Sequence, residues 1–185
     1  MYFVKKNEAK KVCVICFFWI ISIFAQMKKE YNSVEIARYI IAFANDRGIP
    51  INMTKVQKLL YAAYGVFLAV TGERFLNEHP QAWPYGPVFP TTRNKLLKVN
   101  FYEINLHSEE FSEFRSDQIL NSLLQSVFNA FGNWTAGQLT AWSHQDGSPW
   151  EHTVEQEDFT WGNIIPDEQI KGYFNTITRK DGSEK

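Results

Sequence analysis

Apart from two cysteines near its start, this sequence lacks the residues that disulfide or thiol chemistry needs. Cys13 and Cys16 both lie in an apolar run, and no cysteine occurs from Met27 to the end of the 185-residue chain. A single Cys-x-x-Cys pair without a second ligand pair is weak evidence for a redox or metal motif. The remainder of the chain therefore has no disulfide framework, and nothing in it indicates an oxidising compartment.

An excess of basic residues is also missing. The formal net charge is −1, and residues 1–26 hold four lysines against one glutamate, so that the rest carries 15 basic and 19 acidic residues. No basic run alternates with aromatic residues, which is the pattern that a nucleic-acid groove needs. We therefore expect no direct binding of nucleic acid.

The familiar catalytic signatures are absent too. The sequence has no Gly-x-Ser-x-Gly nucleophile turn and no glycine-rich loop of the kind that holds phosphates. Glu109, Glu110, Glu113 and Asp117 are predicted to form a solvated acidic run rather than a paired acid–base site. These observations predict a protein that is not an enzyme and needs no cofactor.

His144, Asp146 and His152 form the one set that resembles metal ligands, and they leave a small metal-dependent hydrolase open as an alternative function. Their spacing matches no common zinc pattern, and a His-Glu-x-x-His helix is absent. The interpretation that we favour places His144 at the end of a helix, where a cation suits the last turn.

Residues 12–25 (VCVICFFWIISIFA) are 14 residues without a charge, and four lysines precede them. This run is short for a membrane span, which needs about 20 apolar residues. It fits a secretory signal or anchor with Ala25 as a cleavage residue. The other interpretation takes Met27 as the true start. On that second interpretation we expect a cytoplasmic domain over 27–178, a frayed tail over 179–185 and no membrane contact; an envelope-anchored interaction module would require residues 1–26.

Apolar residues at helical spacing predict a mainly α-helical, single compact domain of six to seven short helices. The clearest helix has a capping box of Thr54 and Gln57 and ends at Gly72. Its predicted apolar stripe consists of Val56, Leu59, Leu60, Ala63, Phe67 and Val70. The other helices are predicted to begin near Ser33, Pro90, Asp117, Thr135, Ser148 and Pro166. Among these starts, Ser33 is a predicted cap, and two further capping boxes are predicted, Thr135 with Gln138 and Ser148 with Glu151. Residues 100–116 show no clear period and predict at most a short strand or hairpin arm.

Residues 81–88 (QAWPYGPV) combine two prolines, a glycine and two large aromatic residues. The two prolines fix the backbone locally, so the segment is stiff. Such a stiff aromatic loop either closes a small core or forms a surface that binds another molecule. Trp and Tyr are enriched where partners bind most tightly. Lys55 and Lys58 on the preceding helix could meet an acidic partner, although lysines in such positions are usually exposed.

Four blocks of this sequence resemble the Panacea domain, first described in phage-associated, GepA-like proteins. The blocks are residues 55–61 (KVQKLLY) followed by Gly65, Gly72 and Phe75; residues 82–88 (AWPYGPV); residues 139–150 with Ser-His and Pro-Trp pairs; and residues 165–174. The resemblance extends over residues 33–176 but not over residues 1–26, and it therefore favours Met27 as the start.

The resemblance implies a helical antitoxin domain encoded beside a toxin gene in bacteria, prophages or phages. The expected partner is the cognate toxin, and one relative of this kind delivers its toxin to the ClpXP protease. Some relatives carry an added DNA-binding domain, for which this chain has no room. No catalytic residue is carried over. The candidate partner-binding residues are Lys55, Lys58, Tyr61, Trp83, Tyr85, Gly86, Pro87, His144 and Trp150.

Overall fold

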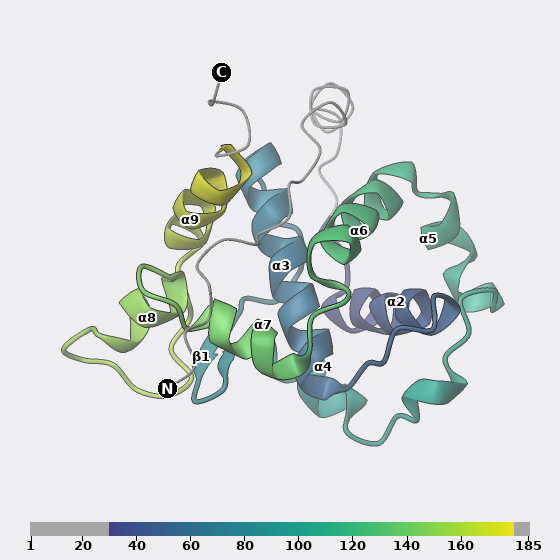
Figure 1. The fold of residues 1–185 in the computed structure, drawn as a ribbon, viewed down its shortest axis with the longest axis horizontal. Coiled ribbons are helices and arrows are strands. Elements are labelled where there is room, and N and C mark those ends of the chain that lie inside the picture. Colours follow the sequence, from purple (N-terminus) through teal and green to yellow (C-terminus); the bar gives the residue numbers. More distant parts are fainter. Residues whose placement is uncertain (1–29, 180–185) are drawn as a thin grey trace.

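The computed structural model of the protein describes residues 30–179. The expectations about residues 1–26 and about the tail beyond Arg179 lie outside this range. The elements in chain order are α2 Ser33–Asp46, α3 Met53–Thr71, β1 Gln81–Trp83, β2 Gly86–Val88, α4 Pro90–Leu96, η1 Phe101–Glu103, η2 Glu109–Phe111, α5 Ser112–Ser116, α6 Gln118–Phe131, α7 Ala136–Ser143, α8 Pro149–Val154 and α9 Asp167–Arg179. The predicted mainly helical fold is confirmed (Figure 1).

Helix α3 is the central element, and α2, α6, α7 and α9 pack around it (Figure 1). It is buried almost continuously from Lys55 to Leu68, including the whole predicted apolar stripe up to Phe67. A helix surrounded by others buries more than one face, which explains why its polar residues are buried as well. Gly72 ends α3 in the left-handed conformation (φ +75°), as the sequence predicted.

The first two helices begin with asparagine caps, so the predicted caps Ser33 and Thr54 are wrong. Asn32 accepts hydrogen bonds from the first-turn amides of α2, and Asn52 does so for α3. The hydroxyl of Ser33 instead donates to Glu78 at 2.8 Å. For Ser33, a tertiary partner has thus taken the hydroxyl that the local pattern assigned to capping.

Caps later in the chain agree better with the sequence. Thr135 and Gln138 form the predicted capping box of α7. Ser148 caps α8 as predicted, but the carboxylate of Glu151 accepts from the amide of Gly147 rather than closing a box.

Residues 101–116 contain no strand, so the strand or hairpin arm predicted there is wrong. They form η1, η2 and the short helix α5, which brings the number of α-helices to eight in the part of the chain that the structure describes. Asn45 of α2 donates from its side-chain amide to the carbonyls of Phe101 at 2.7 Å and Ile104 at 2.9 Å. These two hydrogen bonds tie the segment to α2 and satisfy two of its carbonyl groups.

The only strand pair among the described residues lies in the proline-rich loop itself. β1 and β2 are antiparallel, with Ala82 opposite Pro87 and Trp83 opposite Gly86, and Pro84 and Tyr85 form the turn. On the other side of β1, Ala82 exchanges hydrogen bonds of 2.8 and 2.9 Å with residues 162–163. The hairpin is therefore held along both edges of β1.

Within residues 30–179, no helix combines the length and the apolar character that crossing a membrane would require.

Candidate functional site

The two lysines of α3 are buried, so the expectation that they are exposed is wrong. Lys55 is 5% exposed and its Nζ donates to the carbonyl of Gly132 at 2.8 Å. Lys58 is 1% exposed and its Nζ donates to the carbonyl of Pro87 at 2.9 Å. Burial lowers the pKa of both lysines, and it lowers that of Lys58 to about 7. Neither side chain is free to meet an acidic partner; each fixes a backbone segment.

Gly86 lies against the amine of Lys58. Both its backbone conformation and the close packing around it require a residue without a Cβ. Its φ of +96° is in the left-handed range, and a Cβ here would lie 2.6 Å from Lys58 Nζ, 2.6 Å from Ser143 Oγ and 2.9 Å from His144 Nε2. Three polar atoms, from α3 and from the end of α7, therefore converge on one point of the hairpin backbone.

Two further side chains of α3 point inwards. Gln57 accepts a 2.7 Å hydrogen bond from the amide of Phe89, which anchors the chain just after β2. Tyr61 is 1% exposed, and its ring centre lies 6.1 Å from that of Trp142 and 5.7 Å from that of Phe174. Burial raises the pKa of Tyr61. Tyr61 is thus a core residue that supports the site from within.

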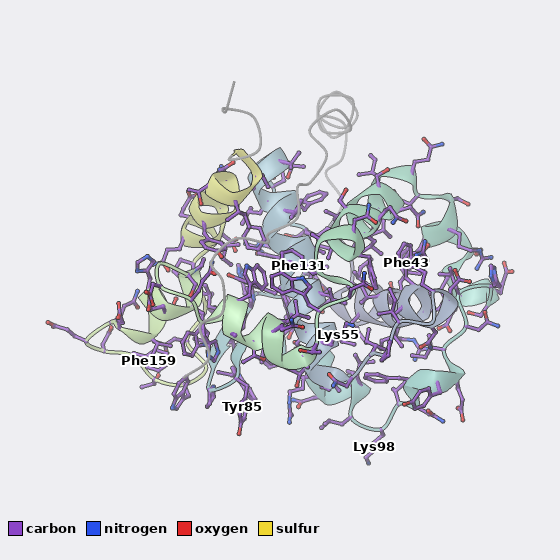
Figure 2. The ribbon with its side chains drawn as sticks, in the orientation of Figure 1. Phe43, Lys55, Tyr85, Lys98, Phe131 and Phe159 are labelled. Carbon is purple, nitrogen blue, oxygen red and sulfur yellow. The ribbon has the colours of Figure 1, made fainter. Side chains whose placement is uncertain are left out.

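The tip of the hairpin carries the exposed aromatic residue. Tyr85 is 76% exposed and projects away from the helices (Figure 2). Trp83 is half-buried; its Nε1 donates to the side chain of Gln81 at 3.2 Å, and the guanidinium of Arg93 lies 5.6 Å from its ring centre. The sequence left open whether Trp83 and Tyr85 belong to core or surface; Tyr85 is exposed, and Trp83 is half-buried.

His144 and Trp150 connect α7 and α8 to this hairpin. Their rings stack at 3.8 Å with an interplanar angle of 9°, and Trp150 Nε1 donates to the carbonyl of Trp83 at 2.9 Å. His144 Nε2 is buried and has no hydrogen-bond partner among the described residues. Burial, and then the charge of Lys58, lower the pKa of His144.

Trp161 also lies near the hairpin, although it was not among the partner-binding residues predicted from the sequence. It is 55% exposed, its ring centre lies 6.5 Å from that of Trp150, and Phe159 meets it edge-on at 4.9 Å. Pairing of residues 162–163 with β1 brings Trp161 to this place, and its sequence neighbour Gly162 (φ +100°) is the one local sign of a turn. We call Trp83, Tyr85, Trp150 and Trp161 the aromatic surface.

His144, Asp146 and His152 are not brought together as ligands. Nowhere in residues 30–179 do three or more His, Cys, Asp or Glu side chains converge so that they could hold a metal ion. The ring of His144 lies against Trp150, whereas Asp146 and His152 are exposed. His144, Asp146 and His152 therefore do not form a metal site among the described residues.

Residues 56–151 match the family described as "Antitoxin SocA-like, Panacea domain". The match covers more than half of the chain and contains Lys58, the hairpin and the His144–Trp150 pair. The chain belongs to this family of antitoxins, as the sequence resemblance predicted.

A curated relative is "Antitoxin SocA" of Caulobacter vibrioides, which is 30% identical over an alignment of 128 residues. The alignment covers 63% of this chain and 66% of that protein, just under two thirds of the relative's length. No solved structure matches the chain.

Proposed function

We propose that this protein is an antitoxin of the cytoplasm that neutralises a toxin encoded beside it by direct protein–protein binding through the aromatic surface. Family membership and the similarity to Antitoxin SocA support the antitoxin role. One observation carries the choice of surface: Tyr85, 76% exposed, stands at the tip of a hairpin that buried side chains hold from beneath.

This arrangement suits binding for a thermodynamic reason. Ordering a loop on binding costs free energy, and a loop that is already fixed avoids most of that cost. Lys58 and Trp150 hold one carbonyl in each strand, and Gly86 lets the backbone approach them closely. Tyrosine then offers a large, rigid contact of the type found where binding energy concentrates.

The predicted partner-binding residues accordingly take two roles. We assign contact with the toxin to Tyr85 and to the accessible parts of Trp83 and Trp150. The remaining predicted residues, which are largely buried, position that surface: Lys55, Lys58, Tyr61, Gly86, Pro87 and His144.

A toxicity rescue tests the proposal. The neighbouring gene product is expressed alone, with the wild-type chain, with Tyr85→Ala and with Tyr102→Ala. Tyr102 is 92% exposed in η1 and serves as the matched control. Rescue by the wild type and by Tyr102→Ala, together with loss of rescue and of complex formation in Tyr85→Ala, is the expected result. The antitoxin role would be refuted by a wild-type chain that neither relieves growth arrest nor forms a complex.

Blocking the toxin and delivering it to the ClpXP protease are two mechanisms for the same role. They differ in the half-life of the toxin, measured after synthesis is stopped in cells with and without the protease. Simple blocking leaves the half-life unchanged or longer when the antitoxin is present. Delivery shortens it, and only in cells that contain the protease.

A further inference from the structure

The two hydrogen bonds that hold the hairpin meet beneath its tip. Lys58 Nζ holds the carbonyl of Pro87 in β2, and Trp150 Nε1 holds the carbonyl of Trp83 in β1, each at 2.9 Å. His144 stands between them: it stacks on Trp150 and directs its Nε2 to the point beside Gly86 that Lys58 Nζ also approaches. Lys58, His144 and Trp150 thus lie together beneath the two strands of the hairpin.

Lys58 and the Nε2 of His144 are both buried here, and each group becomes positively charged when it is protonated. Lys58 Nζ lies 2.6 Å and His144 Nε2 lies 2.9 Å from the position of a Cβ on Gly86. The distance between the two nitrogens therefore cannot exceed the sum of these two values. The other groups around this point are uncharged: the hydroxyl of Ser143, which donates to Thr140, the indole of Trp150, and the backbone of Gly86. Neither Lys58 nor His144 has a carboxylate partner among the described residues.

Two positive charges in this place would repel each other with little water to screen them. A protonated Nε2 would also carry an N–H to be satisfied, and Nε2 makes no hydrogen bond with any of the described residues. The arrangement is therefore compatible with one positive charge on the pair but not with two.

We propose that Lys58 and His144 form a proton-controlled clamp on the hairpin, which holds the tip in place while at least one of the two is neutral and releases it when both are charged. Both act as positioning residues, since neither is assigned a contact with the toxin. The consequence for toxin binding rests on the proposed function: acidification weakens binding even though the titrating groups lie beneath the contact surface.

The clamp can be tested by NMR on the full-length protein in the absence of a toxin. Imidazole signals of the four histidines and the amide signal of Gly86 are followed by NMR from about pH 8.5 to about pH 5, the range in which imidazoles change charge. We expect His144 to become protonated below the ordinary imidazole pKa of 6.5, and the Gly86 signal to move with His144. In Lys58→Met the midpoint of His144 should rise. A midpoint of His144 at or above 6.5, or a Gly86 signal with no component that follows His144, refutes the clamp.

A second variant covers the case in which Lys58→Met does not fold. His144→Gln keeps a polar side chain but cannot be protonated, so the part of the Gly86 response that follows His144 should disappear, and only the change near pH 7 that comes from Lys58 should remain. Persistence of a Gly86 change at the pH where His144 titrates in the wild type would overturn the proposal.

Binding of the neighbouring gene product separates this proposal from the proposed function. The affinity of the wild type should fall about tenfold between about pH 7.5 and about pH 5.5, and that of His144→Gln should change little. An affinity of the wild type that is independent of pH refutes the clamp and leaves the antitoxin role standing. No complex at any pH, with Gly86 still following His144, refutes the toxin contact and leaves the clamp standing.

Discussion

The ring of Phe174 in α9 packs so closely on Gly65 in α3 that a Cβ at Gly65 would lie 2.1 Å from it. Gly65 is thus the position at which the last helix docks on the central one. Tyr64, its neighbour, donates a 2.6 Å hydrogen bond to Asp167 in the first turn of α9 and fixes the other end of the same contact. Docking of α9 therefore depends on the absence of a side chain at Gly65 as well as on the contacts of Phe174 and Tyr64.

Gly65→Ala should destabilise the protein by about 2–3 kcal/mol, because an inserted methyl in a closely packed interface forces side chains and backbone apart. Gly172→Ala in α9 is the control, since nothing lies within 4 Å of a Cβ there. Replacing that exposed helical glycine should stabilise by about 0.5–1 kcal/mol. Urea unfolding of both variants measures the two effects, and equal stabilities would contradict the packing described here.

Gly86→Ala should cost more stability than Gly147→Ala. Both glycines have positive φ, at +96° and +77°, so both substitutions introduce backbone strain of about 1 kcal/mol or more. Only at Gly86 does the new methyl also meet Lys58, Ser143 and His144, whereas nothing lies within 4 Å at Gly147. We expect Gly86→Ala to cost roughly 1–2 kcal/mol beyond the control in thermal or urea unfolding and to weaken rescue from the toxin. A cost no larger than that of Gly147→Ala would refute the crowding.

Trp150→Phe should lower the stability of the protein by about 1 kcal/mol, because it removes the Nε1 donor to the carbonyl of Trp83 and leaves the stack with His144 in place. Trp161→Phe is the matched control at a 55% exposed indole of the same aromatic surface. Urea unfolding should separate the two variants. If both behave alike, the bond from Trp150 does not hold the hairpin.

The free energy of unfolding should rise with pH from 7 to 10 because of Lys58. Its pKa is about 7 in the folded protein and 10.5 in the unfolded chain, so in this window the unfolded chain binds a proton that the folded protein does not. Below pH 7 both states are protonated and the contribution is flat. Above pH 10.0 the tyrosines reverse the trend, because burial raises the pKa of Tyr61 and of others like it.

Lys58→Met should make this rise clearly shallower in urea unfolding at several pH values, with the remainder coming from Lys55, whose pKa burial also lowers. Lys95→Met, at an exposed lysine, should leave the slope as it is in the wild type. A slope that is the same in wild type and Lys58→Met would show that Lys58 titrates normally in the folded protein.

Several features of this protein follow from short stretches of sequence. The apolar stripe of α3, the stop at Gly72 and the capping box of Thr135 and Gln138 depend on residues within a few positions of one another. The stiff loop around Tyr85 was also predictable, since proline and glycine act locally. For such features the backbone needs no distant partner.

Features that depend on partners far along the chain were not predictable in this way. Residues 100–116 showed no clear hydrophobic periodicity in the sequence. They form η1, η2 and α5, and Asn45 of α2 donates hydrogen bonds to two of their carbonyl groups. The pattern of α3 gave no sign that Lys58 is buried, because its acceptor is a carbonyl 29 residues away. Trp161 joined the aromatic surface only through pairing with β1.

The sequence by itself determined the helical class, the positions of most helices, the aromatic loop and membership of the antitoxin family. Tertiary structure decided which of the candidate residues face solvent and which hold the hairpin from beneath. The physical reason is that helix periodicity and turn chemistry are local, whereas the burial of a charged or polar side chain depends on what the rest of the chain places around it. Tyr85 and Lys58 were equal candidates in the sequence, and only the packing of α3, α7 and α8 around the hairpin separates them.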